Sequence, residues 1–93
     1  MITIYNFEEL KGRWISPEYR VNDMVLYEGY YIIYVGPTHT NLFKVAINRN
    51  VVDKNLRFIV YDNDNNELND TYYHKNRINT LDGMRDTLKH LLV

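Results

Sequence analysis

Cysteine is absent from this chain of 93 residues. Disulfide bridges, thiolate nucleophiles and zinc sites built on cysteine are therefore excluded. The longest apolar run, Tyr30 to Val35, is far shorter than the roughly 20 residues that cross a bilayer as a helix. The start of the chain also lacks the basic residues and apolar run of a secretory signal. We therefore expect a soluble, cytoplasmic protein with no membrane partner.

Residue types that carry out catalysis are scarce and scattered. The four glycines lie far apart, so the chain has no glycine-rich loop for phosphate. The single serine, Ser16, precedes a proline and lacks the Gly-x-Ser-x-Gly surroundings of a hydrolase nucleophile. The histidines occur singly, at His39, His74 and His90, without the spacing of a zinc site. We predict that the protein is not an enzyme and carries no cofactor or metal.

The overall composition indicates a single domain over residues 1–93. Apolar residues make up 45% of the chain and charged residues 25%, which is ordinary for a folded protein. A chain of this length holds one hydrophobic core. The formal net charge of −1 argues against a general nucleic-acid binder, since such proteins neutralise phosphates with an excess of Lys and Arg.

Branched and aromatic residues predict a mainly antiparallel sheet. Glu28-Gly29 is a two-residue turn between apolar runs, and it pairs Tyr27 with Tyr30 and Val25 with Ile32. Both faces of this hairpin are apolar, so we expect it at the centre of the sheet, covered at least partly on both sides. The expected strands are Met24–Tyr27, Tyr30–Val35, Leu42–Ile47, Leu56–Tyr61 and a polar edge strand over Glu67–Leu68 and Thr71–His74, with shorter extended pieces at Ile2–Tyr5, Trp14–Ile15 and Val51–Val52.

Helical signals stand at the two ends of the sequence. Asn6 can cap a helical turn over Phe7–Lys11, which stops at Gly12. Near the other end an apolar stripe predicts an amphipathic helix that packs on the sheet, with Thr80 or Asn79 as its cap. The stripe consists of Leu81, Met84, Leu88, Leu91 and Leu92. The fold class is therefore α+β: a sheet of four to five strands, open or curled into a small barrel, with a short N-terminal helix and a C-terminal amphipathic helix.

An acidic segment is the strongest charge imbalance in the chain, because residues 62–70 contain no Lys or Arg. The run Asp62-Asn-Asp-Asn-Asn66 has the composition of a tight turn, since Asn and Asp tolerate a left-handed backbone. A calcium loop of the EF-hand type would need glycine at its sixth position and glutamate at its twelfth. Those positions are Glu67 and Tyr73, so the sequence favours a hairpin turn over a calcium site.

Tyrosine is unusually frequent, with nine residues in the chain. Tyrosine provides a large contact area at low rotamer cost and is enriched in protein interfaces. The alternative interpretation is that these rings fill a small core and its rim. The candidate partner-binding residues combine the acidic turn with the tyrosines that follow it: Asp62, Asp64, Glu67, Asp70, Tyr72 and Tyr73.

A basic cluster supports an alternative function. Arg49, Lys54 and Arg57 gather around one turn beside aromatic strands, and such strands can stack unpaired bases. A nucleic-acid-binding or regulatory domain is therefore the alternative. The carboxylates nearby would repel phosphate, so nucleic acid ranks below a protein partner. An exposed edge strand at Thr71–His74 would also allow a homodimer.

The general profile resembles the small accessory proteins of phages and mobile elements. The chain is short and free of cysteine, and alanine occurs only at Ala46 while Asn, Tyr and Ile are abundant, as in AT-rich genomes such as those of low-GC bacteria and their phages. The resemblance is one of size and composition over the whole chain. Many such proteins bind a host protein, including inhibitors of CRISPR or restriction systems. The resemblance therefore implies a small interaction module that inhibits a host defence or nucleic-acid-handling protein.

Overall fold

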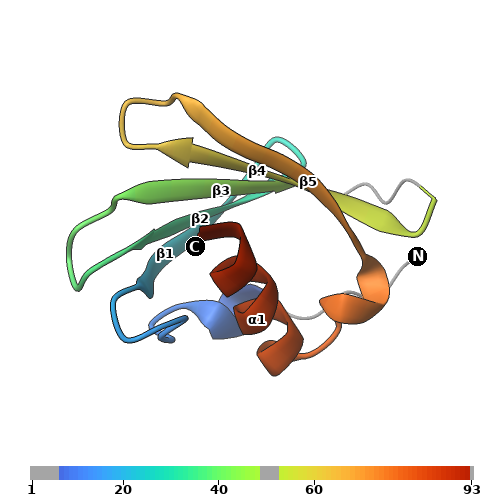
Figure 1. Cartoon of the computed structure of the whole chain (residues 1–93), viewed down its shortest axis with the longest axis horizontal. Coiled ribbons are helices and arrows are strands. Elements are labelled where there is room, and N and C mark those ends of the chain that lie inside the picture. The colour runs from blue at the N-terminus through green and yellow to red at the C-terminus, as the bar shows by residue number, and fades with distance from the viewer. Residues whose placement is uncertain (1–6, 49–52, 93) are drawn as a thin grey trace.

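The computed structural model describes residues 7–48 and 53–92, which form one antiparallel sheet with helical segments on one side (Figure 1). A 3₁₀ turn, η1 (Phe7–Leu10), precedes the sheet, and a second, η2 (Lys75–Arg77), leads from it into the helix α1 (Leu81–Leu92). The predicted α+β class is confirmed. The strands are β1 (Arg20–Tyr27), β2 (Tyr30–Gly36), β3 (Phe43–Asn48), β4 (Asn55–Asp62) and β5 (Glu67–His74).

The strands follow one another in the sheet in sequence order, so β1 and β5 are its two edges. The sheet is open, and the curled-barrel alternative is therefore wrong. The expected position of the polar strand β5 at an edge is confirmed. Within the described ranges, no helix is long and apolar enough to cross a membrane.

The β1–β2 hairpin has the predicted register but not the predicted place. Tyr27 pairs with Tyr30 and Val25 with Ile32, across a turn in which Glu28 and Gly29 both have positive φ. Because a meander leaves its first strand with one neighbour, β1 lies at an edge and the expectation of a central hairpin is wrong. Both faces of the hairpin are apolar for another reason: the sheet is apolar on both sides, and the described elements cover only one of them.

The hydrophobic core lies between α1 and one face of the sheet. Ile33, Val45 and Phe58 alternate with outward residues along β2, β3 and β4, and each is fully buried. The predicted stripe of α1 meets them, with Met84 and Leu88 fully buried in the same cluster. Figure 1 places η1 and α1 on the same side of the sheet. Full burial of one such side chain stabilises the fold by about 1.5–3 kcal/mol.

The start of α1 is fixed against η2 by one cap and one glycine. Thr80 is the N-cap: its Oγ1 accepts the Gly83 N–H at 3.0 Å, and its backbone oxygen accepts the Met84 N–H at 3.0 Å. A Cβ on Gly83 would lie 2.2 Å from the carbonyl oxygen of Arg77. Gly83 therefore allows a close approach of two backbones, which explains a residue that is otherwise unfavourable inside a helix.

The first described element, η1, is a 3₁₀ turn rather than an α-helix. Lys11 and Arg13 donate backbone hydrogen bonds three residues back, to Glu8 and Leu10, and the turn ends at Gly12 with a φ of +84°. The expected extended piece at Trp14–Ile15 is reduced to an isolated bridge between Trp14 and Arg20. The predicted Asn6 cap, the strand at 2–5 and the piece at 51–52 lie outside the described residues.

Candidate functional site

The acidic turn is built around the carboxylate of Asp62. Its Oδ1 accepts backbone N–H groups from Asp64 and Asn66, each at 2.9 Å, and its Oδ2 accepts the Asn66 side-chain amide at 3.1 Å. The bonds from Asn66 are the main cause of a pKa of Asp62 below the ordinary aspartate value. Asn65 takes the left-handed conformation that the composition predicted, with φ +66°. Asp62 thus holds the turn together and has little capacity left for a partner.

Asp70 and Arg57 bind each other across β4 and β5. The Arg57 Nε donates to Asp70 Oδ1 at 2.8 Å, and a second bond joins the other nitrogen and oxygen of the pair. This bidentate pair lowers the pKa of Asp70 and raises that of Arg57. One predicted protein-binding residue therefore neutralises one predicted nucleic-acid-binding residue, and neither charge is freely available.

Tyr72 and Tyr73 point to opposite faces of the sheet, as neighbours in a strand must. Tyr73 lies on the helix side, edge-to-face with Phe58 at a centroid distance of 5.4 Å and 4.9 Å below the Arg77 guanidinium. It belongs to the rim of the core. Tyr72 is 53% exposed on the other side. The sequence predicted that both tyrosines contact a partner, but Tyr73 is a core residue and only Tyr72 is a surface residue.

The remaining candidates that the structure describes are all exposed. Asp64 and Glu67 are exposed at the end of the sheet, and Lys54 is exposed in the turn before β4. Arg49 lies outside the described residues. The structure therefore leaves Asp64, Glu67 and Tyr72 as available partner contacts, and Lys54 as the available cation of the basic cluster.

The side of the sheet that faces away from α1 is here called the open face. No described element packs on it (Figure 1). Val25 is 41% and Tyr27 60% exposed there, while Ala46 and Ile59 lie near its middle and are 7% exposed. Its residues, assigned from the strand register, are Val25, Tyr27, Tyr30, Ile32, Tyr34, Lys44, Ala46, Arg57, Ile59, Tyr61, Asp70 and Tyr72.

Two shallow hollows connect the open face to the acidic turn. One, of about 290 Å³, is lined by Val25, Tyr27, Ile32, Tyr34 and Lys44. The other, also of about 290 Å³, shares Tyr34 and Lys44 with the first and reaches Asp62 and Asn65. The Lys44 ammonium donates to Asn65 Oδ1 at 2.7 Å and stands 5.2 Å from the centre of the Tyr61 ring. Lys44 therefore lines both hollows, and its ammonium group already has a hydrogen-bond partner and an aromatic neighbour.

Sequence reasoning considered the tyrosines as a possible binding surface but missed the apolar residues of β1 and β2 beside them, above all Val25 and Ile32. The signal was present, because the hairpin is apolar on both faces. It was interpreted as a central position in the sheet instead of as an uncovered face. In the described part of the chain, no group of three or more His, Asp or Glu side chains is placed to hold a metal ion.

Comparison of the chain with protein-family models, with curated proteins and with solved structures finds no match.

Proposed function

We propose that this protein is an interaction module that binds another protein through the open face and the acidic turn beside it. One observation carries the proposal: the open face exposes Val25, Tyr27 and Tyr72, and no described element covers it. Large exposed apolar and aromatic side chains on an uncovered sheet face are typical of interaction sites, and tyrosine is among the residues that contribute most to binding.

The charges favour a protein partner over nucleic acid. Binding to a phosphate backbone requires available cations. On the open face, however, Arg57 is paired with Asp70, and Lys44 is bonded to Asn65. At the end of the open face beside the acidic turn, the exposed charges are the carboxylates of Asp64 and Glu67, whereas Lys54 is exposed near the opposite end. The complementary partner surface is therefore an apolar patch bordered on one side by basic residues.

The more specific identity of the partner rests on the sequence. A host defence or nucleic-acid-handling protein has basic grooves into which an acidic turn can dock, which suits an inhibitor of the phage or mobile-element type. A non-catalytic role and a cytoplasmic location belong to the same proposal. Homodimerisation through β5 remains a prediction.

The test is capture of a partner by matched variants. The tagged protein is incubated with nuclease-treated lysate of a low-GC bacterium, and bound proteins are identified by mass spectrometry. Val25→Lys combined with Tyr72→Lys places charge on the open face and should abolish capture. Asp64→Lys combined with Glu67→Lys should weaken it.

The control is Asp82→Lys, which changes an exposed residue of α1 on the opposite side of the sheet. It should capture the same protein as the wild type. The proposal fails if the open-face and acidic variants both capture that protein normally. A parallel capture from untreated lysate tests for nucleic acid, and the proposal also fails if a protein is recovered there but not after nuclease treatment.

A further inference from the structure

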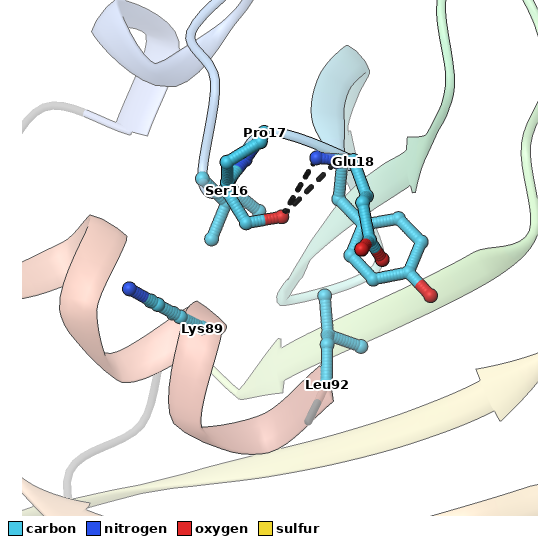
Figure 2. Close-up of a pocket in the computed structure, with 7 residues that line it drawn as sticks. Ser16, Pro17, Glu18, Lys89 and Leu92 are labelled. Carbon is cyan, nitrogen blue, oxygen red and sulfur yellow. Dashed lines mark hydrogen bonds between the residues drawn. The ribbon is translucent and has the colours of Figure 1, made fainter.

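A groove lies on the helix side of the molecule, between the segment of residues 14–19 and α1. It consists of two adjoining hollows of about 350 and 400 Å³. Both are lined by Ile15, Ser16, Pro17 and Lys89, so they form one continuous feature. Figure 2 shows Lys89 and Leu92 rising from α1 on one side, with Ser16, Pro17 and Glu18 on the other. We call it the Trp14 groove, after the aromatic residue at its outer end.

The wall of the groove is held in place by hydrogen bonds. Ser16 Oγ accepts the backbone N–H groups of Glu18 at 3.2 Å and Tyr19 at 3.1 Å. The Ile15 N–H bonds the Tyr19 carbonyl at 2.9 Å. Arg85 ties the wall to α1, because its Nε donates to the Trp14 carbonyl oxygen at 2.9 Å. The site is therefore formed before any ligand arrives, which reduces the entropy lost on binding.

The surfaces of the groove are mainly apolar. Ile15 forms its floor and is 6% exposed, whereas Trp14 is 44% exposed at the outer end. Pro17 and Leu92 line the sides. An exposed indole beside a proline ring is a suitable surface for an apolar side chain of a ligand.

The charges along the groove are predominantly positive. Arg85 and Lys89 are one helical turn apart on the flank of α1 that faces residues 14–18, and both line the groove. Asp86 belongs to the other flank, where it pairs with Arg77 at 3.8 Å. Within the described chain Lys89 makes no ion pair, and in Figure 2 its amine points away from Glu18. Among the described residues, Glu18 is the single carboxylate that lines either hollow. Asp82 lines neither hollow, but its Oδ1 lies 3.9 Å from a guanidinium nitrogen of Arg85. The Asp82 side chain is 95% exposed, so this ion pair is weak and a ligand carboxylate can compete with it.

We propose that the Trp14 groove binds an extended acidic peptide segment of a partner protein. An apolar side chain of the segment lies between Trp14 and Pro17, and flanking carboxylates reach Arg85 and Lys89. A peptide with one apolar residue flanked by acidic residues satisfies both the apolar walls and the two cations. A nucleic-acid strand would bring more phosphates than these cations can neutralise, against the carboxylate of Glu18.

This site is separate from the proposed open-face function, since no open-face residue lines the groove. It also has its own reporter, because Trp14 is the one tryptophan in the chain. The experiment titrates the intact protein with the peptide acetyl-DELDE-amide and follows Trp14 fluorescence. The control peptide, acetyl-NQLNQ-amide, has the same shape without the charge. We expect a saturable blue shift with the acidic peptide and at least roughly tenfold weaker binding of the neutral one.

The variant Lys89→Glu should weaken binding of the acidic peptide roughly tenfold, since it replaces attraction with repulsion. Lys54→Glu makes the same change in charge at an exposed residue that lines neither hollow, and it should bind as the wild type does. Equal affinity for the two peptides, an equal loss in both variants, or no saturable change would overturn the proposal. A shift produced by oligo(dT) and not by the acidic peptide would overturn it in favour of nucleic acid.

Discussion

The two faces of the sheet both carry apolar residues and differ in whether a described element covers them. On the helix side, Ile33, Val45 and Phe58 are fully buried against α1. On the open face, the residues between them along the same strands include Ile32, Tyr34 and Tyr61, which remain partly exposed. The position of an apolar residue along a strand therefore shows which face of the sheet it belongs to. It does not show whether another part of the chain covers that face.

The largest expected difference between the two faces is in their contribution to stability. Phe58→Ala removes a fully buried ring and its contact with Tyr73, so it should lower the free energy of unfolding by about 3–5 kcal/mol. Urea denaturation followed by circular dichroism measures this. A loss below about 1 kcal/mol would mean that the core does not lie on this face.

The close packing of α1 against η2 can be tested at Gly83. Alanine would ordinarily stabilise a helix interior relative to glycine by about 1 kcal/mol. Here the added Cβ meets the Arg77 carbonyl oxygen, so Gly83→Ala should instead destabilise the protein by about 1–3 kcal/mol. Thermal unfolding of Gly83→Ala beside the wild type gives the sign. A rise in melting temperature would show that η2 and α1 are not this close.

Acid should weaken the hydrogen bonds that the carboxylates of Asp62 and Asp70 accept. Asp62 and Asp70 have pKa values lowered by their hydrogen bonds, whereas in the unfolded chain an aspartate has a pKa of about 3.9. Their stabilising contribution is therefore complete above that value and is lost as the pH falls through the lowered pKa values. The free energy of unfolding should decline from about pH 4 downward.

Asp62→Asn and Asp70→Asn should each flatten this decline, because each removes one group that binds a proton on unfolding. Urea unfolding between pH 2 and pH 6 measures the slope. Asp64→Asn is the matched control, since its side chain accepts none of these bonds, and its profile should follow the wild type. Identical slopes in all the proteins would contradict the assigned contacts.

The smallest expected effect on stability belongs to the open face itself. Tyr72→Ala removes a ring that is 53% exposed and should change the free energy of unfolding by no more than about 0.5 kcal/mol. The same variant should reduce partner capture. Phe58→Ala and Tyr72→Ala thus test whether the residues that maintain the fold can be separated from those proposed to bind a partner.

Much of the fold was accessible from the sequence because its signals are local. The turn at Glu28-Gly29, the stripe of α1 and the alternation in β2 to β4 each depend on residues within one or two elements. The Arg57–Asp70 pair was not accessible, because it depends on how β5 registers against β4. That register shifts between Val60 and Tyr61, and the position of the bulge cannot be read from residue types.

The acidic candidates show the same limit. Composition correctly indicated a turn, but not that Asp62 would be occupied by the backbone of that turn while Asp64 stays exposed. Likewise, Tyr72 and Tyr73 are alike in sequence and differ only in which face is covered by α1. The choice between a structural and a binding role depended in each case on tertiary packing.

The most direct test of the central claim is tyrosine footprinting of the protein alone and with its captured partner. Hydroxyl-radical labelling with mass spectrometry reports the accessibility of each ring. If the open face is the binding surface, Tyr27 and Tyr72 will be labelled in the free protein and protected in the complex, while labelling of Tyr73 on the helix side will stay unchanged. Equal labelling of Tyr27 and Tyr72 in the free and bound protein would contradict the claim that the open face is the binding surface.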